Sequence, residues 1–242
     1  MQPELKPIPT NENSFGRGSQ TWEAAQPIAT DSQKVLRNTY LLLALTMVPT
    51  VIGAMIGMST SGLMMQHPIM LTIVMLGAVI GLQFAIAANR DSGLGVALLL
   101  LMTGLLGWFL GPMLTVALAL KNGPDLVGYA AGGTGLVMAV MATIATTTKK
   151  DFSFMGKFLF VGMIVLLVAM LANMFLQIPA LALTISSLVI VVFSMFLLHD
   201  LSRIVTGGET NYVMATTGVY LSIFNIFANL LSLLMALTGE KD

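Results

Sequence analysis

The 242-residue sequence contains no cysteine, only two histidines and few charged residues. The absence of cysteine excludes disulfide bonds, thiolate metal sites and a cysteine nucleophile. Charged residues make up 9% of the chain, whereas a soluble domain carries about 25%. The formal net charge is zero, so the overall balance indicates no nucleic-acid partner. Because zinc-protease, nucleophile-elbow and phosphate-loop motifs are also missing, we expect no catalytic residue, no metal site and no cofactor.

Hydrophobic residues are abundant instead, at 56% of the chain. They form seven runs, each near the ~20 residues that a helix needs to cross the hydrocarbon core. These runs lack the alternation of polar and apolar residues that is typical of a barrel strand. The sequence therefore predicts an all-α membrane protein with a seven-helix transmembrane domain over residues 39–242. The spans are expected at about 39–58, 68–89, 94–118, 126–148, 156–176, 180–204 and 211–237.

Residues 1–38 are polar and contain several prolines, with too little apolar surface to fold alone. We predict a disordered tail there, and its location follows from the basic residues near the helix ends. If the tail is cytoplasmic, that side carries Lys34, Arg37, Arg90, Lys149, Lys150, Lys157 and Arg203, and the opposite side carries Lys121 and Lys241. This asymmetry predicts a cytoplasmic N-terminus and a periplasmic C-terminus.

Glycine is frequent and recurs at a spacing of four residues within the predicted helices. The pairs are Gly53/Gly57, Gly77/Gly81, Gly107/Gly111 and Gly128/Gly132. Such pairs let two helix backbones approach closely, most often within one bundle. The fourth predicted span, 126–148, is diluted by glycine and threonine. We therefore expect this weakly hydrophobic span to lie at the centre of the bundle rather than against lipid.

Asp200 lies near the end of the sixth predicted span, shortly before Gly207 and Gly208 interrupt the helix. Two interpretations stay open. The first is a carboxylate near the membrane surface that contacts water or pairs with Arg203. The second is a proton- or cation-responsive group buried among the second, sixth and seventh spans, because a charge inside the bilayer is costly and marks function when it is retained.

Polar residues follow one face of the seventh predicted span. They are Gly218, Ser222, Asn225, Asn229 and Ser232, spaced four, three, four and three residues apart. On a helix this spacing gathers them into one narrow stripe. Facing lipid, the amides would lack partners, so the stripe is expected to face the bundle or a wet cavity. It is either a set of hydrogen bonds between helices or the polar lining of an ion or proton path.

Four stretches resemble the Bax inhibitor-1 family of seven-helix membrane proteins, and within it the bacterial YccA-like branch. They are residues 34–40, residues 150–154, residues 172–181, and the turn Gly207, Gly208, Glu209, Thr210, Asn211 and Tyr212 with its continuation to Phe227. The stretches keep a consistent spacing over residues 34–237. The turn is the most specific of the four, and it favours the YccA-like branch over the members described as calcium leaks.

The resemblance implies a multi-pass protein of the bacterial inner membrane. It further implies binding to FtsH, a membrane-anchored ATP-driven protease, as a modulator and a slow substrate. A polar N-terminal tail is a suitable handle for such an enzyme, although a simple linker would have the same composition.

The calcium-leak branch of the family implies an alternative function, a pH-sensitive calcium, cation or proton leak. There, two aspartates on the last two helices share a proton and close the pore with a basic residue from the second helix. Asp200 matches the first aspartate, the second falls at Ser222, and Arg90 lies near the position of the basic residue. A shared proton requires two carboxylates in close contact, and this sequence supplies one. Calcium is therefore expected only under the alternative function.

Overall fold

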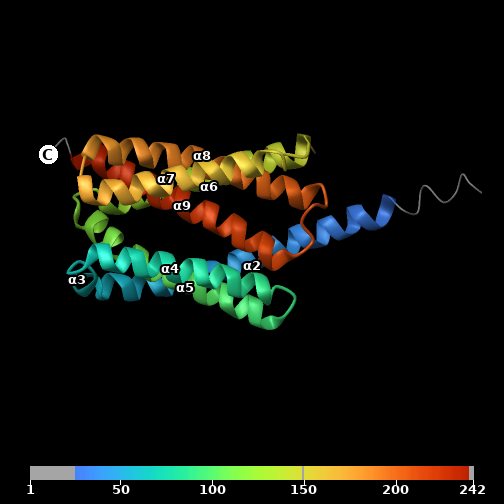
Figure 1. Ribbon diagram of the computed structural model, residues 1–242, viewed down its shortest axis with the longest axis horizontal. Helices are drawn as coiled ribbons and strands as arrows, with labels where there is room; N and C mark the ends of the chain where they lie inside the picture. The colour runs from blue at the N-terminus through green and yellow to red at the C-terminus, as the bar shows by residue number, and fades with distance from the viewer. Residues whose placement is uncertain (1–24, 149, 240–242) are drawn as a thin grey trace, which may run out of the picture.

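The structure of the protein is a computed structural model that describes residues 25–148 and 150–239 (Figure 1). Its elements are α2 (Ala25–Ser59), α3 (Ser61–Met64), α4 (Pro68–Ala88), α5 (Gly93–Ala119), α6 (Gly123–Thr148), α7 (Met155–Leu176), α8 (Pro179–Val205) and α9 (Tyr212–Gly239). Within this part of the chain there is no strand, and seven helices are long and apolar enough to cross a membrane. The predicted seven-helix transmembrane bundle is confirmed.

The first helix begins earlier than predicted. The predicted tail ended at residue 38, but residues 25–38 belong to α2. Hydrophobic contacts explain the extension, because Val35 and Leu36 pack against the main hydrophobic core. Pro27 falls in the first turn of the helix, where a missing backbone N–H costs no intrahelical hydrogen bond. The remainder of the predicted tail, residues 1–24, lies outside the described residues.

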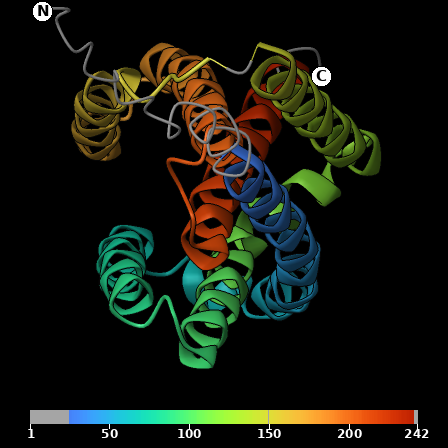
Figure 2. The same cartoon turned by 90° about the vertical axis from the view of Figure 1, so that its right-hand side faces the viewer.

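Helix α9 is the central element of the bundle. It packs against α2, α4, α5, α6 and α8, and an end-on view shows it surrounded by them (Figure 2). Its Tyr220 is 1% exposed and joins three helices, because its hydroxyl lies 2.8 Å from the Thr50 hydroxyl on α2 and donates to the Thr103 carbonyl on α5 at 3.3 Å. These bonds satisfy a buried hydroxyl and fix α9 against its neighbours.

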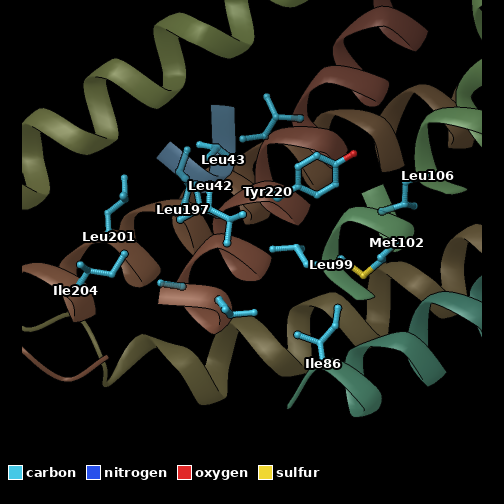
Figure 3. Close-up of a cluster of buried hydrophobic side chains, with 14 of the residues drawn as sticks. Leu42, Leu43, Ile86, Leu99, Met102, Leu106, Leu197, Leu201, Ile204 and Tyr220 are labelled. Carbon is cyan, nitrogen blue, oxygen red and sulfur yellow. The ribbon is translucent and has the colours of Figure 1, made fainter. Parts of the chain in front are cut away.

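The main hydrophobic core surrounds Tyr220 (Figure 3). It includes Leu42 and Leu43 from α2, Ile86 from α4, Leu99, Met102 and Leu106 from α5, and Leu197, Leu201 and Ile204 from α8. A second cluster, around Leu110, Leu126 and Leu231, fills the other half of the bundle. The main core therefore lies in the half of the bundle that contains the α8–α9 turn, and the helix ends on both sides of that turn pack on it.

The closest helix contact is the crossing of α2 and α5. A Cβ atom added at Gly53, Gly57, Gly107 or Gly111 would collide with the backbone of the opposite helix. Two of the predicted glycine pairs therefore meet face to face within one chain. The pairs Gly77/Gly81 and Gly128/Gly132 do not, since a Cβ atom at any of these four positions meets nothing within 4 Å.

The prediction that the fourth span lies at the centre was wrong. Helix α6 is the least hydrophobic of the seven spans, yet only 11% of its most apolar 18-residue stretch is buried inside the bundle. Its threonines explain how a weakly polar helix can stay at the periphery. Thr143 donates to the Ala139 carbonyl at 2.8 Å and Thr146 to the Ala142 carbonyl at 2.8 Å. Because these hydroxyls are satisfied by their own helix, they need no partner from another element.

Three connections gather at one end of the bundle together with the N-terminal end of α2 (Figure 1). They are the α4–α5, α6–α7 and α8–α9 turns, and we call this end the α8–α9 end. The described basic residues Arg90, Lys150 and Arg203 lie there. The assignment of this end to the cytoplasm stays a prediction from charge asymmetry.

The α2–α5 crossing yields a stability prediction. Gly107→Ala should lower the thermal midpoint of the detergent-solubilised protein by roughly 3–10 °C, because the new methyl group meets the Thr50 backbone carbonyl and forces the helices apart. Gly77→Ala is the matched control, since its methyl group enters open space on α4. It should leave the midpoint unchanged or raise it slightly, because alanine favours the helix. Equal midpoints for the two variants would contradict the proposed role of the crossing.

Candidate functional site

The candidate site lies at the α8–α9 turn, which carries the predicted family-signature residues Gly207, Gly208, Glu209, Thr210, Asn211 and Tyr212. Helix α8 ends at Val205, and Gly207 follows with a φ of 80°. This left-handed conformation favours glycine because a Cβ atom would be strained there. The turn is closed by the Glu209 N–H, which donates to the Arg203 carbonyl at 3.0 Å.

Glu209 holds the turn from two sides. Its Oε2 accepts a hydrogen bond from Arg203 Nη2 at 3.2 Å, and its Oε1 accepts from the Asn211 backbone N–H at 3.0 Å. The carboxylate therefore connects the last turn of α8 with the residue that precedes α9. A second contact of Arg203 Nη2, to the Gly208 carbonyl at 3.4 Å, completes this small network.

Asn211 performs two tasks with one amide. Its Oδ1 accepts from the backbone N–H groups of Val213 at 3.0 Å and Met214 at 3.1 Å, which caps the start of α9. Its Nδ2 donates to the Arg90 carbonyl at 3.0 Å and to Asp91 Oδ1 at 2.7 Å. The amide thus ties the α8–α9 turn to the α4–α5 turn, 120 residues earlier in the chain.

Asp200 lies beneath this turn, where α8 meets α9. Its Oδ1 lies 3.1 Å from His199 Nδ1, and its side chain is 20% exposed. A Cβ atom at Gly218 would lie 2.6 Å from Asp200 Oδ2, so the carboxylate packs directly on the glycine of α9. The missing side chain at Gly218 is what makes room for Asp200.

A cavity of about 190 Å³ borders Asp200. Its lining comes from α4, α8, α9 and the turn, namely Gln83, Asp200, Arg203, Glu209, Met214, Ala215, Thr217 and Gly218. Two carboxylates and one guanidinium therefore share a small space near the α8–α9 end. Among the described residues, no group of three His, Cys, Asp or Glu side chains is arranged to hold a metal ion.

Arg90 does not lie where the resemblance implied. Its side chain is 56% exposed, and its Nε lies 3.6 Å from Asp91 Oδ2 in the α4–α5 turn. Only its backbone carbonyl takes part in the network, through Asn211. The basic side chain at the Asp200 cavity is Arg203, one helical turn after Asp200 on the same helix. The first interpretation of the sequence already placed Arg203 beside Asp200, since residues three apart share a helix face.

The polar stripe of α9 was predicted to face the bundle or a wet cavity. Ser222 is buried, at 2% exposure, and the described residues show no hydrogen bond between it and Asp200. Asn225 donates to the Leu221 carbonyl at 2.8 Å, and Asn229 donates to the Asn225 carbonyl at 2.9 Å. Because both amides donate within their own helix, they do not form the predicted hydrogen bonds between helices. Of the stripe, Gly218 alone lines the Asp200 cavity.

His199 is a buried neighbour of Asp200, which the sequence did not indicate. It is 9% exposed, and a Cβ atom at Gly156 would lie 2.9 Å from its Nε2. The imidazole therefore lies between α7 and α8 and contacts Asp200 through its other nitrogen. The only sequence signal was the glycine on the facing helix, which cannot be recognised without knowing that α7 and α8 pack there.

The α6–α7 connection docks beside His199. The Phe152 backbone N–H donates to Ser202 Oγ at 3.3 Å, and the Ser153 N–H donates to Asp151 Oδ1 at 2.8 Å. Hydrogen bonds from the Ser153 side chain and backbone lower the pKa of Asp151 below its ordinary value, and His199 and Arg203 act in the same direction. The carboxylate thus stays ionised in this turn to a lower pH than a free aspartate would.

These features define a polytopic helical membrane protein whose last two helices meet at a polar turn. The chain belongs to the Bax inhibitor-1 family, because the family model described as inhibitor of apoptosis-promoting Bax1 matches residues 32–239. The predicted family is confirmed.

Bacterial relatives share most of the chain. An uncharacterized membrane protein of Vibrio cholerae is 44% identical over 204 residues, which cover 84% of this chain and 90% of that protein. The modulator of FtsH protease YccA of Escherichia coli is 42% identical with the same coverage. An uncharacterized protein of Pseudomonas aeruginosa is 38% identical over 208 residues, 86% of this chain and 91% of that protein. With its seven apolar helices, the chain is a multi-pass protein of the bacterial inner membrane.

The double role of Asn211 predicts a graded loss of stability. Asn211→Ala removes both the cap of α9 and the link to the α4–α5 turn, and should destabilise the protein by about 1–2 kcal/mol. Asn211→Ser retains a capping hydroxyl and loses only the link, so its cost should be about half as large. Both variants should exchange the amide hydrogens of residues 89–92 faster than the wild type. Unchanged exchange there in both variants would show that the link contributes nothing.

Proposed function

We propose that this protein binds and modulates an FtsH-type protease in the inner membrane. The observation that carries the proposal is the 42% identity to a protein named as a modulator of FtsH protease, over 84% of the present chain. The family match spans residues 32–239 and therefore includes the α8–α9 turn. The similarity therefore extends over the whole membrane domain, which supports a shared function better than a local motif would.

The proposal gives the protein no catalytic activity of its own. The family description and the names of the relatives above do not describe an enzyme. The sequence offers two histidines and no cysteine, and the Asp200 cavity contains no paired nucleophile and base. Modulation then acts through binding, by helix contacts in the bilayer and by the N-terminal segment.

Residues 1–24 are the part of the chain that we assign to engagement by the protease. They are polar and contain three prolines, a composition that an ATP-driven unfoldase can pull without first disrupting a packed core. Helix α2 begins directly after them. The segment therefore leads straight into the first membrane span, so that pulling on it would act on the α2–α5 crossing.

Co-purification and turnover test this proposal. The tagged full chain should co-purify with FtsH from mild detergent, and deletion of residues 2–24 should lengthen its half-life in cells that contain FtsH. The matched control replaces residues 2–24 by a Gly/Ser segment of equal length, which keeps the reach of the N-terminus and changes its sequence. Absence of co-purification, together with unchanged turnover of FtsH substrates when the protein is deleted, would overturn the proposal.

A leak of calcium, other cations or protons is the second candidate function. One observation favours it: the Asp200 carboxylate borders a cavity that also contains Glu209 and Arg203. One observation weakens it, since the position of the second aspartate is the buried Ser222. Under this function Asp200 is the proton- or cation-responsive group, and the other carboxylate that lines its cavity is Glu209.

Flux measurements distinguish the two candidates. If the protein is a leak, calcium flux into proteoliposomes should respond to pH, and Asp200→Asn should alter it. Asp91→Asn is the matched control, because it removes an exposed carboxylate at the same end of the bundle, outside the cavity. Flux equal to that of empty vesicles would reject the leak and leave the modulator proposal intact.

A further inference from the structure

A second cavity lies within the membrane domain, away from the α8–α9 turn. It has a volume of about 450 Å³ and is flanked by α2 and α6, with α5 and α9 completing its walls. The lining residue nearest a helix end is Val127, four residues after the start of α6. The cavity therefore lies at the depth of the hydrocarbon core. Its volume is in the range that is typical of ligand pockets.

The walls of this cavity are apolar, and their hydroxyl groups are already satisfied. Thr50 Oγ1 donates to the Thr46 carbonyl at 2.7 Å and lies 2.8 Å from the Tyr220 hydroxyl. Thr134 Oγ1 donates to the Ala130 carbonyl at 2.7 Å. A water molecule needs two to four polar partners in a buried site. Since the three hydroxyls are engaged elsewhere, the cavity favours an apolar occupant without hydrogen-bonding groups.

The size of the cavity favours a narrow occupant. Ten residues of a helix about 10 Å across would displace roughly 1,200 Å³, more than the whole empty space between the lining atoms, about 1070 Å³. Ala54, Ala131 and Gly135 supply small wall positions, and Met47 and Met138 supply flexible side chains that adapt to an irregular shape. A single hydrocarbon chain fits these walls, whereas a partner's transmembrane helix would protrude from them.

We propose that the cavity between α2 and α6 binds one acyl chain of a bilayer lipid. The chain lies against α9 and contacts Phe224 and Phe227, which line the cavity beside Tyr220. A bound chain joins α6 to α2 on the side of the cavity opposite the buried residues Leu126 and Ala130, which pack in the second hydrophobic cluster. This inference is independent of the proposed function, because it concerns a lipid and not the protease.

Photolabelling of the full chain in proteoliposomes tests the inference. The probe is a phosphatidylcholine with a diazirine near the end of one acyl chain, and the labelled residues are mapped by mass spectrometry. Adducts should concentrate on cavity residues such as Met138 and Phe227. Gly135→Leu should lose most of these adducts, because its side chain enters the cavity from a position where a Cβ atom meets nothing within 4 Å.

The matched control is Gly132→Leu, one turn earlier on α6. A Cβ atom there also meets nothing within 4 Å, but Gly132 does not line the cavity, so labelling should match the wild type. Ala131→Leu fills the cavity from a second position and should repeat the loss if Gly135→Leu fails to fold. The inference would be overturned if adducts on the wild type spread evenly over the lipid-facing helix α7. It would also be overturned if Gly135→Leu or Ala131→Leu folded and still showed labelling in the cavity. A third result would also overturn it: the wild-type cavity is unlabelled, and a membrane protein that co-purifies with the wild type is lost from Gly135→Leu or Ala131→Leu. The occupant would then be a helix of that protein.

Discussion

The structure depends on a constraint that the bilayer imposes: helices gain little from apolar burial there, so close backbone contact and satisfied polar groups must hold them together. The α2–α5 crossing meets the first requirement through glycines on both helices. Tyr220 meets the second, because its hydroxyl contacts α2 and α5 from the central helix. The remaining helices are arranged around these contacts, with α6 and α7 at the periphery.

The same constraint explains why the α8–α9 turn has a specific sequence. Gly207 supplies the left-handed conformation, Glu209 joins Arg203 to the Asn211 N–H, and Asn211 links two turns. Each of these residues has a structural reason that requires no substrate or ion. The sequence of residues 207–212 is therefore explained first by the geometry of the turn. Any function of this region depends on the neighbouring Asp200 cavity.

Sequence reasoning succeeded where one property decides the outcome. Length and hydropathy predicted all seven spans, because a helix must cover the hydrocarbon core whatever its neighbours are. It failed where the answer depends on packing: α6 carries glycine and threonine on an uncovered face, and residues 25–38 extend α2 because Val35 and Leu36 meet the core. The contact between His199 and Asp200 was missed for the same reason, since the contacts of a side chain follow from the helices around it.

The position of Asp200 bears on how far this chain could act as a leak. An ion passing beside Asp200 would have to separate α8 from α9, where the carboxylate packs on Gly218 without an intervening side chain. The same two helices are joined above that point by Glu209 and held to the α4–α5 turn by Asn211. Ser222 stands in place of the second carboxylate, and Glu209, which shares the Asp200 cavity, is bound by Arg203. The arrangement favours a bundle that stays closed at this end, which is compatible with a binding role in the membrane.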